Sequence, residues 1–323
     1  MSIQFCSTLS AARNEALTGT APAHQRYLFA EIPAPWPYHA IESANVPPEL
    51  RQALQNLKEA ETPIRLQAFY SEEMSSPEHM RRFFYFTLPK PPYAAYRKRE
   101  YLVPESECPA FVQTIAAADE EQLMNTFETY RVTETEHVAE WFVCTHGSHD
   151  FCCGRIGAPV YIEMKDRFGS SDGNFRVWRT DHMGGHRFAP TAMEFPSGRF
   201  WGRLESEVLD LIVERKGEFA PLLSYYRGWS GIGKLEQLAE AELMKRFGWK
   251  AIHWQKQASI IMQNEEKAVV HIIVYAGAEN EQLIYEAEIE RDEPVEVFGC
   301  SGSQSLVEKY KLVRLEQRNA NAS

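Results

Sequence analysis

Residues 140–168 read EWFVCTHGSHDFCCGRIGAPVYIEMKDRF. The apolar segment 140–147 predicts a buried strand that runs into a loop, and three of the chain's six cysteines lie close together there. The segment 158–168 predicts a helix, because a proline stands in its first turn, where a missing N–H costs nothing. The stretch therefore predicts a strand, a cysteine-bearing loop and a helix in immediate succession.

The same unit continues beyond this helix. We expect a strand at 175–182, a hairpin at 191–204 around a Pro-Ser-Gly turn, and a helix at 206–217. The first third of the chain repeats much of this order. Its expected elements are a strand at 26–32, a helix at 47–61, strands at 63–70, 81–89 and 98–104, and a helix at 108–118. Both units follow the β-α-β-ββ-α order of the thioredoxin-like fold.

The residues after 230 have a different pattern. We expect an amphipathic helix at 234–248, ended by a glycine, and then an antiparallel meander. The expected strands of the meander are 250–257, 267–276, 283–294 and 295–302. The polar tail at 316–323 is expected to fray.

The fold class predicted from these elements is α/β (α+β), in three parts. The first is a thioredoxin-like unit at 1–135, and the second is a thioredoxin-like domain at 136–230 that contains the clustered cysteines. The third, at 231–323, is a C-terminal extension of one helix plus antiparallel strands. No low-complexity linker separates the three parts, so we expect them to pack against one another.

The composition is that of a globular protein that stays in the compartment where it is made. Hydrophobic residues make up 44 % of the chain and charged residues 24 %, which is enough apolar material for real cores. No apolar run approaches the roughly 18 residues of a membrane span. The N-terminus also lacks the basic and apolar regions of a secretory signal. These features predict a cytoplasmic location without a membrane partner.

The charge balance limits the possible partners. The formal net charge of the 323 residues is −11. Such a chain would repel a phosphate backbone, and it has no basic stripe interleaved with aromatic residues, so nucleic acid is not expected as a partner. The simplest interpretation of the acidity is solubility. A sharper interpretation is docking to a basic reductase or electron acceptor.

Two pairs of metal-ligand residue types stand in predicted loops. Cys144 and Cys153 form a Cys-x8-Cys pair, and His182 and His186 form a His-x3-His pair around two glycines, which argue against a helix. Two thiolates and two imidazoles suit a Rieske-type iron–sulfur cluster or a tetrahedral zinc site. Neither spacing is that of a zinc finger. Spacing alone leaves iron–sulfur, zinc and a purely structural role open, and it leaves Cys152 as a rival to Cys153.

The neighbouring cysteines and histidines have simpler interpretations. Cys6, Cys108 and Cys300 are expected to be small hydrophobes, since unmodified cysteine is among the most buried residue types. His146 and His149, inside the Cys-x8-Cys loop, have two interpretations: groups that support the metal ligands, or solvent-facing polar residues, of which the second is favoured. No opposed pair of carboxylates stands out as the acid and nucleophile of a glycosidase, so no catalytic residue is assigned.

Two long motifs resemble those of a known family. They are CTHGSHDFCCGRIGAPVY, from residue 144, and VWRTDHMGGHRFAPTAMEFPSGRFWGRL, from residue 177. Together with GTAP at 19–22 and EIPAPWP at 31–37, they resemble the sucrase/ferredoxin-like family of thioredoxin-like ferredoxins. The resemblance covers roughly residues 1–230.

The resemblance implies a cofactor and a ligand set. In that family a [2Fe–2S] cluster is held by the two cysteines and the two histidines of these motifs. The corresponding positions here are Cys144, Cys153, His182 and His186. The family pattern thereby favours Cys153 over Cys152 as the second thiolate.

The resemblance also implies an electron-transfer protein with Rieske-like mixed ligation. Its partner would be another redox protein, a reductase or an acceptor, which the sequence does not identify. One alternative is an oxidoreductase that depends on the cluster or on the vicinal thiols Cys152 and Cys153, although a Cys-x-x-Cys motif is absent. Another alternative is a zinc-stabilised binding module. An electron carrier is favoured over a catalyst.

Overall fold

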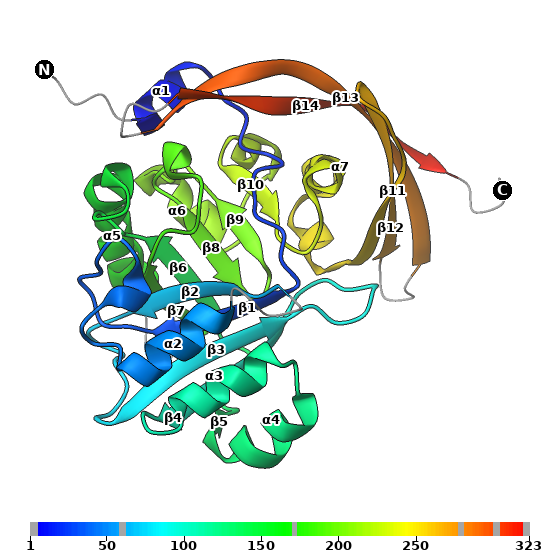
Figure 1. Cartoon of the computed structure of the whole chain (residues 1–323). Helices are drawn as coiled ribbons and strands as arrows, with labels where there is room; N and C mark the ends of the chain where they lie inside the picture. The colour runs from blue at the N-terminus through cyan, green and yellow to red at the C-terminus, as the bar shows by residue number, and fades with distance from the viewer. Residues whose placement is uncertain (1–5, 58–62, 170–172, 277–280, 300–303, 319–323) are drawn as a thin grey trace, which may run out of the picture.

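The computed structural model describes residues 6–57, 63–169, 173–276, 281–299 and 304–318. These residues form two sheets, one of ten strands and one of four (Figure 1). The strand order of the large sheet is β10-β9-β8-β6-β7-β2-β1-β3-β4-β5, and that of the small sheet is β11-β12-β13-β14. The large sheet contains strands from both of the predicted thioredoxin-like units.

The N-terminal half forms one side of the large sheet. Its elements are α1 (Cys6–Ala12), β1 (Arg26–Glu31), α2 (Pro48–Asn56), β2 (Arg65–Tyr70), β3 (Met80–Thr87), β4 (Arg97–Pro104), α3 (Cys108–Ala116), α4 (Glu120–Phe127) and β5 (Arg131–Val132). All six residues of β1 are buried, because it lies between parallel β2 and antiparallel β3 with both faces covered. For this reason its middle residues, 27–30, read as a continuous apolar run rather than an alternating one, between the buried charges of Arg26 and Glu31.

The second half repeats this topology on the other side of the sheet. Its elements are β6 (Ala139–Cys144), the π-helical turn η4 (Cys153–Gly157), α5 (Ala158–Phe168), β7 (Phe175–Thr180), η5 (His186–Phe188), β8 (Ala192–Phe195), β9 (Arg199–Trp201), α6 (Ser206–Val213), η6 (Ala220–Ser224) and β10 (Tyr226–Trp229). β6 pairs parallel with β7 and antiparallel with β8, as β1 does with β2 and β3. An antiparallel pairing of β2 with β7 joins the halves into one sheet.

The mixed α/β class and the antiparallel C-terminal sheet are confirmed. The predicted boundaries at 135 and 230 fall in connections, between β5 and β6 and between β10 and the next helix. The thioredoxin-like classification of each unit and the division into domains stay predictions. None of the helices in the described ranges combines the length and the apolar character needed to cross a membrane.

The C-terminal part differs in detail from its prediction. It consists of α7 (Lys234–Phe247), η7 (Gly248–His253), β11 (Gln255–Gln263), β12 (Lys267–Ala276), β13 (Glu281–Phe298) and β14 (Gln304–Arg318). The strands expected at 283–294 and 295–302 are joined, because β13 runs from 281 to 298 and a register shift between Asp292 and Val295 takes up Pro294. Residues 300–302 of the second expected strand lie outside the described residues. Strand β14 was missed, and it includes the first residues of the tail that was expected to fray.

The small sheet packs against α7 and extends as far as α1. Every second residue of β12 is buried, and this face packs against α7. Figure 1 shows β13 and β14 arching over α7 as far as α1. There Arg13 donates a hydrogen bond of 2.9 Å to the carbonyl of Glu296 and lies 4.5 Å from the ring of Phe298. The N-terminal helix is thus held between β13 of the C-terminal sheet and the turn η5.

Candidate metal centre

Cys144 and Cys153 are brought together by close packing of backbone. Cys144 is the last residue of β6, and Cys153 begins the π-helical turn η4. A Cβ added at Gly157 would lie only 2.1 Å from the carbonyl oxygen of Cys144. A Cβ at Gly154 would lie 2.5 Å from the Cα of Gly147. Only glycine therefore allows η4 to lie directly against the end of β6.

His182 and His186 lie on the loop that follows β7. Gly184 and Gly185 between them have φ of +87° and +76°, in the left-handed region that favours glycine. Arg227 packs on this turn, since its guanidinium donates a hydrogen bond of 3.0 Å to the carbonyl of Gly184. The same guanidinium would lie 2.6 Å from a Cβ at Gly185. The two glycines thus let the chain reverse between the two histidines.

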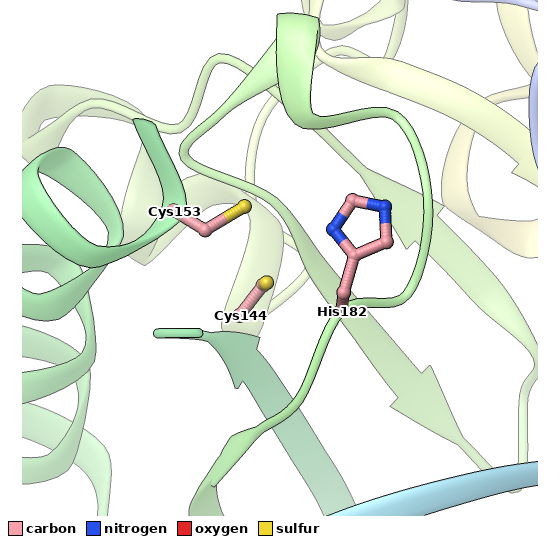
Figure 2. Close-up of side chains that lie close together, drawn as sticks. All are labelled: Cys144, Cys153 and His182. Atoms are coloured by element: carbon pink, nitrogen blue, oxygen red, sulfur yellow. The ribbon is translucent and has the colours of Figure 1, made fainter. Parts of the chain in front are cut away.

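Three of the four predicted ligands form one group. Potential donor atoms of Cys144, Cys153 and His182 all lie within 4.8 Å of one another. Figure 2 shows the two sulfur atoms side by side, with a ring nitrogen of His182 turned towards them. This nitrogen is bonded to Cγ, the ring carbon attached to Cβ, so it is Nδ1. It is buried and has no hydrogen-bond partner among the described residues.

The pKa values of the Cys153 thiol and the His182 imidazole in this group are those expected where a cation binds. A hydrogen bond with Cys144, together with burial, raises the pKa of the Cys153 thiol. Burial first, and then the nearby His149 and His186, lower the pKa of His182 to about 3. The imidazole is therefore neutral, as a metal ligand must be. Two buried thiolates would need a positive charge between them, and a metal would supply it.

His186 belongs to a second group of potential ligands. Its Nδ1 lies 2.9 Å from Oδ2 of Asp150 and 3.1 Å from the sulfur of Cys6. Donor atoms of these three residues again lie within 4.8 Å of one another. The rings of His186 and His182 are 5.8 Å apart. The fourth predicted ligand is thus adjacent to the first group, and its Nδ1 contacts Asp150 and Cys6.

His146 and His149 are not ordinary solvent-facing residues. His146 is buried, its Nε2 lies 2.8 Å from the carbonyl of Pro37, and its Nδ1 accepts a hydrogen bond of 3.2 Å from the N–H of His182. Nε2 must then be the protonated nitrogen, and burial lowers the pKa of this imidazole. His149 is half-buried, and its ring stacks on that of His182. Both residues hold the His182 loop in place.

A family model described as sucrase/ferredoxin-like matches residues 17–228. The chain belongs to the sucrase/ferredoxin-like family. The matched range includes nine strands of the large sheet, all but the last residue of β10, and the Cys-x8-Cys and His-x3-His motifs. No curated protein and no solved structure gives a significant match.

Two parts of this member of the sucrase/ferredoxin-like family lie outside the matched range, α1 and the C-terminal part that begins with α7. Cys6 on α1 is buried as predicted, but its sulfur lies 3.4 Å from that of Cys152 and close to His186. Cys108 is a buried thiol, as expected, and its sulfur lies 3.4 Å from the carbonyl of Pro104. Cys300 lies outside the described residues.

Sequence reasoning missed three residues around the site. Asp150 could have been suspected, because it stands inside the Cys-x8-Cys loop. Nothing in the sequence indicates Cys6, which is 180 positions from His186. Arg227 was equally hidden, although it is a buried cation whose charge interacts with both Cys144 and Cys153. Burial, and then the charge of Arg187, lower the pKa of Arg227 to about 10.

Proposed function

We propose that this chain is an electron-transfer protein that carries a [2Fe–2S] cluster on Cys144, Cys153, His182 and His186. The observation that carries the proposal is the buried group of two thiols and one imidazole, whose Nδ1 has no partner among the described residues. A buried polar atom without a partner is costly, so its presence beside two sulfur donors favours a bound metal. Membership of the sucrase/ferredoxin-like family supports the same assignment.

The surroundings of His186 fit the fourth ligand. Ligating histidines commonly donate their second ring N–H to a carboxylate, which orients the ring and makes the ligating nitrogen more basic. Asp150 lies at that position, 2.9 Å from Nδ1 of His186. Nε2 is then the nitrogen left for the cluster. The donor set of two thiolates and two imidazoles is that of a Rieske-type centre.

When bound, the cluster would accept one electron and return it. The protein's own residues would set the conditions for this exchange. Cys144 and Cys153 lie in an aromatic core with Phe142 and Trp178, which keeps water from the sulfur atoms. Arg227 places a buried positive charge near the two thiolates. Neutral imidazoles reduce the negative charge of the ligand set, so the reduction potential is raised relative to that of all-cysteine clusters.

Anaerobic purification tests the proposal directly. We expect a red-brown protein with visible absorption that is bleached by reduction, and with iron and acid-labile sulfide in equal amounts. A colourless protein that contains zinc would contradict the proposal.

One observation favours a second candidate, a zinc-stabilised module. The donor atoms of Cys144, Cys153 and His182 lie within 4.8 Å of one another, which is compact enough for a single tetrahedral ion. The fourth ligand would be His186 or a water molecule. The same purification separates the two candidates, because zinc gives no visible absorption.

A further inference from the structure

Three aromatic rings form a continuous stack that ends at the candidate metal centre. The ring of Tyr38 lies 4.5 Å from that of His149, with an angle of 13° between their planes. The ring of His149 lies 4.1 Å from that of His182, at 10°. His182 in turn directs Nδ1 towards the sulfur atoms of Cys144 and Cys153 (Figure 2).

We propose that the stack Tyr38–His149–His182 is the route by which electrons enter and leave the centre, and that Tyr38 is the point of contact with a redox partner. This inference rests on the proposed function. It adds the position on the surface at which exchange takes place and the kind of partner that fits there.

Burial limits where a partner can approach the centre. Cys144 and Cys153 are each 1 % exposed, so a partner protein cannot touch the sulfur side of the centre. Tyr38, at the other end of the stack, is 54 % exposed, the only tyrosine among the described residues with a large hydrophobic surface in solvent. The rate of electron tunnelling falls exponentially with the gap between donor and acceptor. Rings in van der Waals contact fill the space between the centre and the surface with packed atoms, which couple donor and acceptor better than water does.

The stack is held by specific contacts. The loop before Tyr38 is fixed to the Cys-x8-Cys loop twice, by His146 Nε2 at 2.8 Å from the carbonyl of Pro37 and by Ser148, whose hydroxyl donates to the carbonyl of Trp36. His39 packs edge-on against Tyr38, with the ring centres 4.9 Å apart at 85°. These contacts restrict the rotamers of Tyr38 and keep its ring stacked on His149.

The charge of the chain indicates the kind of partner. The net charge is −11, and the exposed Glu42 follows Tyr38 closely in the sequence. A redox protein with a basic face would therefore be steered to this molecule, and the steering would weaken as salt is added. Tyr38 itself offers a flat ring against which the edge of a haem or flavin can pack.

Stopped-flow oxidation of the reduced, cluster-loaded protein by cytochrome c, a basic haem protein, tests the route. The variants are Tyr38→Ala and Tyr38→Phe, with Tyr225→Ala as the control, since Tyr225 is a partly exposed tyrosine that bonds Glu205. We expect the limiting rate at saturating cytochrome c to fall about tenfold in Tyr38→Ala. It should stay near the wild-type value in Tyr38→Phe and Tyr225→Ala. The visible and electron paramagnetic resonance spectra should be those of the wild type in all three variants.

Several outcomes would overturn the inference and leave the proposed function intact. One is an unchanged limiting rate in Tyr38→Ala with intact spectra, which would point to exchange through His186, whose side chain is 25 % exposed. Another is a change only in the cytochrome c concentration that gives half the limiting rate, which would make Tyr38 a docking contact without a role in electron transfer. A fall in Tyr38→Phe as large as in Tyr38→Ala would exclude ring stacking as the cause. A wild-type protein without a cluster would instead refute the proposed function itself.

Discussion

Nδ1 of His186 and Oδ2 of Asp150 lie 2.9 Å apart, and the carboxylate is almost fully buried. Oδ1 of the same carboxylate accepts a hydrogen bond of 3.1 Å from the N–H of Cys152. Asp150 therefore ties the His-x3-His loop to the turn that carries Cys153. It controls the orientation of His186 without being a ligand in the proposed centre.

Asp150→Asn should weaken retention of the metal. Loss of such a carboxylate partner typically costs 10- to 100-fold in metal affinity, so we expect iron to be lost to a chelator about ten times faster. Asn keeps the oxygen that accepts from Cys152, which isolates the effect on His186. Asp166→Asn is the matched control, because that carboxylate is 64 % exposed on α5. Equal release rates in the two variants would show that Asp150 does not support a ligand.

Substitution of the cysteines separates ligands from neighbours. Cys144→Ser and Cys153→Ser should abolish stable cluster assembly, because serine lacks the thiolate that iron–sulfur centres require. Cys152→Ser should leave most of the visible absorption, since the sulfur of Cys152 faces Cys6 at 3.4 Å rather than the other two cysteines. Absorption per chain after anaerobic purification measures all three. A bleached Cys152→Ser variant beside a coloured Cys153→Ser variant would reverse the assignment.

Gly157→Ala should disturb the centre through the backbone. The added Cβ would meet the carbonyl oxygen of Cys144 at 2.1 Å, so η4 must move away from β6. Overpacking of this kind costs about 1–3 kcal/mol. We expect a loss of that size in the free energy of unfolding, measured by denaturant titration, and less iron per chain. The control Ala158→Gly, which adds no atoms, should retain its iron. Full iron content in Gly157→Ala would show that the close approach of Gly157 to Cys144 is not needed.

A buried ion network should make stability depend on pH. Glu100 lies 2.5 Å from Arg176 and 3.0 Å from Arg82. Burial alone would raise the pKa of Glu100, but the hydrogen bond and charge of Arg176 outweigh burial and bring the pKa below its ordinary value of 4.5. A carboxylate with a lowered folded-state pKa stabilises the fold above its unfolded-state pKa, and this contribution is lost as the pH falls through the folded-state pKa.

We therefore expect the free energy of unfolding to fall as the pH is lowered from about 5 to about 3. Glu100→Gln should lose about 3 kcal/mol at neutral pH and should show a shallower decline in acid. Glu78→Gln is the control, because the side chain of Glu78 is 88 % exposed. Denaturant titrations at each pH measure the effect. Parallel pH curves for Glu100→Gln and the wild type would rule out this carboxylate as the source.

Most individual elements could be predicted from the sequence. The helix at 158–168 and the strand at 267–276 have the predicted bounds, because proline placement and a run rich in valine and isoleucine are local signals. The long strand β13 was divided in two, since Pro294 suggests a break where the sheet instead tolerates a register shift. Strand β14 was missed because much of it is exposed and its composition is polar.

The candidate ligands could also be identified from local sequence patterns. Cys144, Cys153, His182 and His186 were identified as two spaced pairs on loops, and the family pattern selected Cys153 over Cys152. Which of them share a group, and which nitrogen of each histidine is engaged, depends on how two loops meet. That meeting depends on glycines whose role is visible only in three dimensions.

The sequence by itself determined the mixed α/β class, the repeated order of elements and the presence of the two motifs, because hydrophobic periodicity and turn residues act over a few positions. Only the tertiary structure decided that Cys6 and Asp150 meet His186, that His146 supports His182, and that Tyr38 ends a stack of rings. These contacts join distant parts of the chain. They arise when apolar surfaces pack against each other, and a linear pattern does not record which surfaces will do so.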